Sequence, residues 1–167
     1  SGLAWDAVEM ANLARRAEVE WVGVNCGIMD QMIAAAGQEG HALLLDCRSL
    51  ERRLVKMPDA VAIVVLDTGT RRDLIASSYN SRREECVRAA RVLGKASLRD
   101  VTEDDLEAAA STMGEGVLLR RARHVVTENA RTLRAADAMA RNDAPALGRL
   151  MNESHDSLRD DFEVSSP

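Results

Sequence analysis

The segment GVNCGIMDQ, residues 23–31, encloses a short turn between two glycines and then opens a helix. Upstream of it, residues 5–21 repeat apolar side chains at helical spacing, with arginines and glutamates off the stripe, and so predict a first helix. Gly23 breaks that pattern. A second helix is predicted over residues 28–36, and Gly37 is suited to end it. The chain therefore opens with a helix, a glycine turn and a second helix.

Beyond the second helix, the spacing of apolar residues becomes that of strands. Residues 41–47 form an apolar run of strand length, and residues 53–57 alternate between apolar and charged side chains. Residues 61–66, with the sequence VAIVVL, are continuous and rich in β-branched side chains, which is typical of a strand buried on both faces. Three strands are thus predicted in this part of the chain.

From about residue 74 onward the chain is helical in period. Helices are predicted over residues 79–93, 100–113, 118–140 and 147–158. The start of the second of these, Thr102–Asp105, resembles a capping box. Near the end, Phe162 and Val164 alternate with charges like the opening of a strand, and the sequence starts at Ser1 without a methionine. We therefore expect this sequence to be part of a longer protein.

Composition excludes several classes of protein. The 167 residues are 46% hydrophobic and 29% charged, which is the balance of a globular protein with a core. Aromatic residues make up only 2% and the net charge is −5, so nucleic-acid binding is not expected. No apolar run is long enough to span a membrane, and the start does not resemble a signal peptide. Three widely spaced cysteines indicate free thiols in a cytosolic protein rather than disulfides or structural zinc.

Several residues could carry chemistry, and taken alone they leave their roles open. Asp30 lies in the first turn of the second helix, where the simplest role of a carboxylate is to stabilise the helix dipole. Glu18 shares a helix face with apolar residues, which is an unusual place for a carboxylate without a function. Tyr79, the only tyrosine, could pack or bind. The basic run at residues 120–124 is interpreted as a solvated face. A catalytic triad around His155 is rejected, because adjacent helical residues point in different directions.

A resemblance to a known family changes this interpretation. Seven segments, in order along essentially the whole chain, are similar to galactokinase, a member of the GHMP superfamily of small-molecule kinases. The segments are residues 17–18, 22–31, 41–50, 79–86, 98–102, 123–131 and 151–165.

The resemblance implies a role for five residues. Asp30 resembles the residue that takes or orients the proton of the anomeric hydroxyl of the sugar. Gly27 and Tyr79 resemble sugar contacts, with Cys26 beside Gly27 in the same turn, and Glu18 resembles the acidic ligand of magnesium. Phosphoryl transfer depends on positioning and charge neutralisation, so one carboxylate near the nucleophile and one on the metal is the expected pair.

The resemblance also implies parts that this sequence does not contain. The family's N-terminal sugar signature, its ATP phosphate loop and its C-terminal glycine-rich motif are absent. We therefore expect a central fragment of the kinase that is inactive alone. The implied fold is α+β, predominantly helical with a few strands. Residues 1–60 would end the N-terminal domain, and residues 61–167 would form part of the C-terminal domain.

The implied activity is the ATP-dependent phosphorylation of galactose to galactose 1-phosphate, by a phosphotransferase with an alcohol group as acceptor. The expected ligands are galactose, ATP and Mg²⁺, in a cytoplasmic enzyme without nucleic acid, membrane or an obligatory protein partner. Two alternatives stay open, a galactose-sensing regulator related to the kinase and an N-acetylgalactosamine kinase. Cys26 before Gly27, and Tyr79, resemble the pattern of the plain galactose enzymes.

Overall fold

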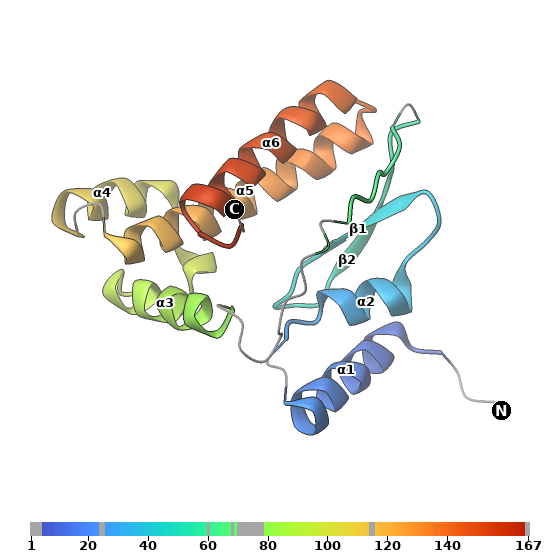
Figure 1. Ribbon diagram of the computed structural model, residues 1–167, viewed down its shortest axis with the longest axis horizontal. Helices are drawn as coiled ribbons and strands as arrows, with labels where there is room; N and C mark the ends of the chain where they lie inside the picture. Colours follow the sequence, from blue (N-terminus) through green and yellow to red (C-terminus); the bar gives the residue numbers. More distant parts are fainter. Residues whose placement is uncertain are drawn as a thin grey trace. The chain divides into compact units, whose positions relative to one another are not determined.

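A computed structural model describes residues 5–23, 26–59, 61–67, 69, 79–113 and 116–165. The described chain is mostly helical and contains one two-stranded sheet (Figure 1). The predicted α+β class with few strands is therefore confirmed. No helix in these ranges is both long enough and apolar enough to cross a membrane.

The chain divides into two compact units. The first is Ser1–Ser77 with Met139–Asn142, and the second is Ser78–Ala138 with Asp143–Pro167. The division predicted at residue 60, between an N-terminal and a C-terminal kinase domain, stays a prediction, because compactness does not locate the boundary of a larger fold.

The first unit begins with α1 (Ala7–Ala17), which continues into a π-helical turn, η1 (Glu18–Val22). The carboxylate of Asp6 caps α1 by accepting a hydrogen bond from the Glu9 backbone N–H at 2.9 Å. The predicted apolar stripe is wrong for its large residues, because Trp5 is 70%, Leu13 56% and Trp21 88% exposed, while Ala11 is the buried residue of α1. A π turn is wider than an α turn, so residues after Glu18 no longer follow the 3.6-residue period.

A helix and a hairpin complete the regular structure of the first unit. They are α2 (Met29–Ala36), β1 (His41–Leu45) and β2 (Arg52–Lys56), with the strands antiparallel. Figure 1 shows α2 between the hairpin and α1. The buried residues of this core, from α1 and from α2 with its start, are Ala11, Ile28 and Met32, with Leu43 and Leu45 of β1 packed against them. The first helices and the first two predicted strands are thus confirmed.

Gly37 ends α2 as predicted, but for another reason. Its φ is −65°, so it does not use the left-handed conformation that favours glycine at helix ends. A Cβ at this position would lie 2.5 Å from the carbonyl oxygen of Ile33. The close approach of the chain to the last turn of α2 is what requires glycine here.

The third predicted strand is wrong. Residues 61–67 have no strand structure, and within the described chain β1 and β2 pair only with each other. The apolar side chains of this run face solvent, with exposed fractions of 79% for Ile63, 74% for Val64, 88% for Val65 and 83% for Leu66. A β-branched run becomes a buried strand only where a neighbouring strand supplies its hydrogen bonds. We call residues 61–67 the apolar segment.

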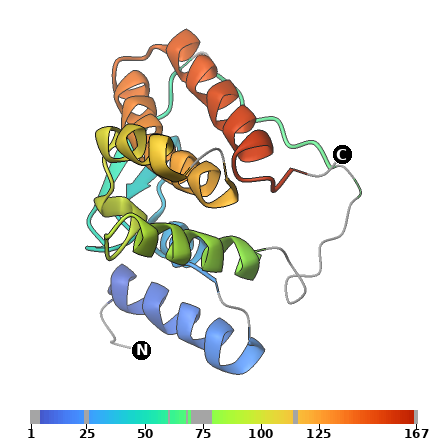
Figure 2. The same ribbon diagram turned by 90° about the vertical axis from the view of Figure 1, so that its left-hand side faces the viewer.

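The second unit is helical. Its elements are α3 (Tyr79–Val92), the 3₁₀ turn η2 (Leu98–Asp100), α4 (Glu103–Met113), α5 (Val117–Ala140) and α6 (Ala144–Asp160). Figure 2 shows α5 and α6 side by side, with α3 along the base of this group. All four predicted helices of this part are confirmed within a few residues at each end.

Small and branched apolar side chains build the core of the second unit. The buried residues, from α3 through α5, are Ala89, Ala90, Leu98, Val101, Leu106, Leu119, Ala122 and Val126. The predicted capping box at the start of α4 is confirmed. The Thr102 backbone N–H donates to the Asp105 carboxylate at 2.9 Å, and the Asp105 N–H donates to the Thr102 hydroxyl at 3.1 Å.

The predicted solvated face at residues 120–124 is wrong for two of its residues. Arg121 is 1% exposed and His124 is 6% exposed. The Nε of Arg121 donates to Glu85 at 2.7 Å, and its Nη2 donates to Glu163 at 2.7 Å. Glu85 and Glu163 lie 36 and 42 residues from Arg121 along the chain. The guanidinium is buried because distant carboxylates meet it there, which local charge patterning does not reveal.

The strand opening predicted at the end of the chain is also wrong. Residues 162–165 are irregular, and Glu163 has a positive φ of 54°. The ring of Phe162 stacks on His124 with centroids 4.4 Å apart. The Nε of Arg82 donates to the Phe162 carbonyl at 2.6 Å. Contacts to α3 and α5 therefore hold this segment where sheet pairing was expected.

Candidate functional site

Three side chains of the first unit meet where η1 approaches α2. The amide Nε2 of Gln31 donates to Glu18 Oε1 at 2.8 Å, and the thiol of Cys26 donates to Glu18 Oε2 at 3.3 Å. The same Nε2 lies 3.8 Å from the sulfur of Cys26. The structure thus brings two of the predicted site residues, Glu18 and Cys26, into direct contact and adds a third residue, Gln31, to them. We call these three residues the Glu18 cluster.

The turn at Cys26 is tied to α1 as well as to the Glu18 cluster. The Nε of Arg15 donates to the Cys26 carbonyl at 3.2 Å. Burial, together with the hydrogen bond to Glu18 and its negative charge, raises the pKa of the Cys26 thiol. Cys26 is therefore a protonated donor at neutral pH and is not an activated nucleophile. All three cysteines of the chain are free thiols.

Asp30 and Gly27 are adjacent in sequence to members of the Glu18 cluster, and both are exposed to solvent. Asp30 is exposed in the first turn of α2, where the helix dipole favours the charged carboxylate. Apart from its chain neighbours, no atom of the described residues would lie within 4 Å of a Cβ built on Gly27, so its backbone is open on that side. A ligand could therefore approach the Gly27 backbone closely and lie within reach of the first turn of α2. Tyr79 begins α3 in the second unit, and its side chain lies outside what the structure describes.

The carboxylate oxygens of Glu18 suit a hard cation such as Mg²⁺, and the thiol of Cys26 in the same cluster donates a hydrogen bond to that carboxylate. Gln31 Oε1 is buried and has no hydrogen-bond partner among the described residues, so a second oxygen lies in the same cluster as the Glu18 carboxylate. Mg²⁺ takes oxygen ligands and usually only one or two from the protein, with phosphates and water completing its shell. Within the described residues, no group of three or more His, Cys, Asp or Glu side chains could hold a metal. The fit is thus to a sparse, phosphate-assisted cation site at Glu18.

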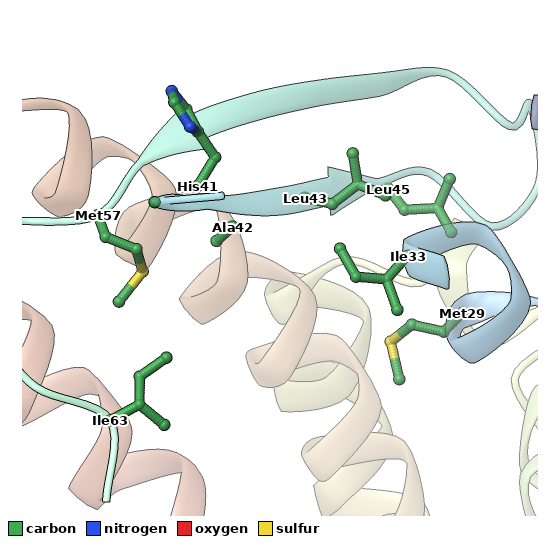
Figure 3. Close-up of a pocket in the computed structure, with 9 residues that line it drawn as sticks. Met29, Ile33, His41, Ala42, Leu43, Leu45, Met57 and Ile63 are labelled. Atoms are coloured by element: carbon green, nitrogen blue, oxygen red, sulfur yellow. The ribbon is translucent and has the colours of Figure 1, made fainter. Parts of the chain in front are cut away.

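The first unit also contains an apolar pocket of about 430 Å³ (Figure 3). Its lining comes from α2, β1 and the residues after β2: Met29, Ile33, Gly40, His41, Ala42, Leu43, Leu45, Met57 and Ile63. Figure 3 shows Met29 and Ile33 on the side of the pocket that faces Leu43 and Leu45. A sugar needs several converging hydrogen-bonding groups, and His41 is the one polar side chain of this lining. None of the predicted site residues lines it.

Gln31 is the residue of the site to which the sequence analysis assigned no role. A signal for it exists, because Gln31 stands three residues after the buried Ile28 and next to the buried Met32. A glutamine on the apolar face of a helix needs a hydrogen-bond partner. The identity of that partner, Glu18, follows only from the packing of α2 against α1.

Comparison with solved structures finds a similar protein, whereas comparison with family models does not. No protein-family model matches the chain. Among solved structures, the chain is similar to the galactokinase of Lactococcus lactis in a complex with galactose, with 34% sequence identity and a TM-score of 0.87. The predicted resemblance to galactokinase is confirmed. The match covers 98% of this chain and 44% of that chain, so this chain spans less than half the length of the Lactococcus galactokinase.

At 98% of the chain, the galactokinase likeness extends over both units. Glu18, Cys26, Gly27 and Asp30 belong to the first unit, and Tyr79 belongs to the second. The roles of these five residues in sugar or metal binding stay predictions at this point.

Proposed function

We propose that this chain is part of a galactokinase, which transfers the terminal phosphoryl group of ATP to the anomeric hydroxyl of galactose. The observation that carries the proposal is the 34% identity to a galactokinase over 98% of the chain, with a TM-score of 0.87. Because the chain covers only 44% of that protein, the activity belongs to the complete gene product that contains this sequence.

In this proposal Asp30 acts on the sugar. Its carboxylate is exposed on the first turn of α2 and close in sequence to the open backbone of Gly27. A carboxylate at hydrogen-bond distance from the anomeric hydroxyl can orient that hydroxyl and accept its proton as the new bond to phosphorus forms. The open side of Gly27 lets the sugar ring lie against the backbone, with Cys26 and Tyr79 as further contacts.

Glu18 is the residue of this chain that would hold Mg²⁺. A bound magnesium ion would neutralise charge on the phosphates of ATP. The contribution of Glu18 is a carboxylate already fixed by two hydrogen bonds, from Gln31 and from Cys26. Both donors are uncharged, so the negative charge of Glu18 is not cancelled by them.

The test is Asp30→Asn in the complete gene product, with Asp104→Asn as the matched control. Asp104 is exposed and also lies in the first turn of a helix, α4, so it shares the dipole interaction but not the sugar site. We expect Asp30→Asn to lower kcat by about 10²–10⁴-fold, the range for removal of a general base, with little change in the unfolding midpoint. Asp104→Asn should leave kcat unchanged.

The assay compares galactose with N-acetylgalactosamine as acceptor. Phosphorylation of galactose alone supports the proposal. Preferred phosphorylation of N-acetylgalactosamine contradicts the proposal that galactose is the substrate. A wild-type protein that binds galactose but phosphorylates neither sugar is a sensor and contradicts the activity. Near-normal kcat in a destabilised Asp30→Asn variant contradicts the catalytic role of Asp30 and leaves it a helix-dipole role only.

A further inference from the structure

We propose that Gln31 is a positioning residue for Glu18, which holds the carboxylate in one orientation for the cation through the hydrogen bond from its Nε2. The inference deepens the proposed function and rests on it, because it takes Glu18 to be the cation ligand. It assigns a role to a residue that is neither charged nor exposed.

The first argument is the geometry of the carboxylate. Gln31 Nε2 donates to one oxygen of Glu18 at 2.8 Å, and the Cys26 thiol donates to the other at 3.3 Å. Two donors on two different oxygens fix the plane of the carboxylate. An ionised carboxylate offers about four lone-pair sites, so each oxygen keeps one for a ligand. The hydrogen bonds therefore orient Glu18 without occupying it.

The second argument is the cost of the glutamine to the fold. Gln31 is 8% exposed, and its Oε1 is buried with no hydrogen-bond partner among the described residues. A buried acceptor without a partner destabilises a protein by about 1–3 kcal/mol. Methionine would fill nearly the same volume without that cost. The amide oxygen is thus unfavourable for packing, and the contact that this side chain does make is the hydrogen bond from its Nε2 to the Glu18 carboxylate.

The third argument is the place of the cluster in the unit. Glu18 is the first residue of the π-helical η1, and π turns in helices are frequent at functional sites. The side chain of Glu18 lies on η1 and that of Gln31 lies on α2, so their hydrogen bond joins two elements. A change in the approach of α2 to α1 therefore alters the orientation of Glu18 directly.

The experiment replaces Gln31 by methionine in the complete gene product, with Gln38→Met as the matched control. Gln38 is the other glutamine of this chain and is exposed after α2. The first readout is Mn²⁺ binding, measured by electron paramagnetic resonance in the presence of a non-hydrolysable ATP analogue. The second is the Mg²⁺ concentration for half-maximal activity, together with the KM for galactose and the unfolding midpoint.

We expect Gln31→Met to weaken Mn²⁺ binding about tenfold or more, the range for loss of a hydrogen bond to a charged group. The Mg²⁺ requirement should rise by a similar factor, while the KM for galactose stays within twofold of the wild-type value and the unfolding midpoint does not fall. If Gln31 had a purely structural role, Gln31→Met would lower the unfolding midpoint and leave Mn²⁺ binding unchanged. Mn²⁺ binding within twofold of wild type in a folded Gln31→Met variant overturns the proposal.

Two further variants keep the outcome decisive. Gln31→Asn retains the amide but is one methylene shorter, so it tests the loss of the Glu18 contact if the methionine variant does not fold, with the same expectation. The exchange Glu18→Gln with Gln31→Glu retains a Glu–Gln pair and the net charge. We expect the exchanged protein to have the unfolding midpoint of the wild type but not its Mn²⁺ binding, because the carboxylate now lies on α2. Recovery of wild-type Mn²⁺ binding overturns the positioning role.

Glu18→Gln alone separates this inference from the proposed function. If Glu18→Gln binds Mn²⁺ like the wild type, Glu18 is not the cation ligand and both fail. If Glu18→Gln binds Mn²⁺ weakly and Gln31→Met binds it normally, the function stands and only the role of Gln31 fails.

Discussion

Replacing Glu85 by glutamine should destabilise the second unit by an amount that the Arg121 contacts set. The Glu85 carboxylate accepts hydrogen bonds from Arg121 at 2.7 Å and from Arg82 at 3.1 Å, and the Arg121 side chain is 1% exposed. Full isolation of a buried charge costs about 3–5 kcal/mol. Arg121 keeps Glu163 and the Asp161 carbonyl as partners, so the loss is smaller. We expect the free energy of unfolding to fall by about 2–3 kcal/mol, the strength of one or two hydrogen bonds to a charged group.

The pH dependence of this effect has a definite sign. Burial alone would raise the pKa of Glu85, but the hydrogen bond and charge of Arg121, assisted by Arg82, hold the pKa below its usual range. A carboxylate with a depressed pKa in the folded state contributes its full stability above its unfolded pKa of about 4.3. That contribution is lost as the pH falls through the folded pKa. The difference between wild type and Glu85→Gln is therefore complete at pH 7 and shrinks in acid.

The assay is urea unfolding of the 167-residue chain, followed by circular dichroism at neutral pH and in acid. With an m-value of about 1–3 kcal/mol/M, the expected loss moves the midpoint down by about 0.7–3 M. Glu84→Gln is the control, because Glu84 precedes Glu85 on α3 and is exposed. Equal midpoints for Glu85→Gln, Glu84→Gln and wild type at pH 7 would refute the reasoning, as would a difference that persists unchanged in acid.

Three further predictions concern the open glycine, the buried histidine and the apolar segment. Gly27→Ala in the complete gene product should raise the KM for galactose about tenfold or more without loss of stability, because its Cβ meets no atom within 4 Å in the described part of the chain beyond its neighbours; an unchanged KM removes Gly27 from the sugar site. Burial lowers the pKa of His124, so the folded state holds it neutral and loses stability as the pH falls below about 6.5. His124→Gln should make the unfolding temperature fall less between pH 7 and pH 5 than it does in the wild type. An equally steep fall in both proteins would contradict this role of His124. Val65→Lys should change the free energy of unfolding by less than about 0.5 kcal/mol, since Val65 is 88% exposed; a loss above about 2 kcal/mol in urea unfolding would indicate a buried strand.

Features that depend on neighbouring residues could be predicted from the sequence. The capping box of Thr102 and Asp105 needs only residues three apart, and the helix ends follow from local periodicity. The antiparallel strands β1 and β2 are joined by a short connection, so their pairing is local as well. The resemblance to galactokinase rests on segments in order, which a sequence also displays.

Features that depend on distant residues could not be predicted. The burial of Arg121 requires Glu85 and Glu163, which reach it from two other elements. The apolar segment has the composition of a buried strand, but composition does not supply the neighbour whose backbone such a strand needs. In both cases a distant partner decides the outcome, once by its presence and once by its absence among the described residues.

Asp30 and Gln31 illustrate how two adjacent residues of one helix turn can have different functions. Neighbouring helical positions differ by about 100° in direction, so one faces solvent while the next faces α1. Asp30 is exposed and Gln31 is 8% exposed, in hydrogen-bond contact with Glu18. Asp30 faces the solvent side of α2, whereas the amide of Gln31 contacts Glu18. Substitutions of the two residues should therefore affect different kinetic parameters. Loss of Asp30 should lower kcat at any Mg²⁺ concentration. The effect of losing Gln31 should instead disappear when the Mg²⁺ concentration is raised. If saturating Mg²⁺ restored Asp30→Asn, or failed to restore Gln31→Met, this division of roles within the turn would be wrong.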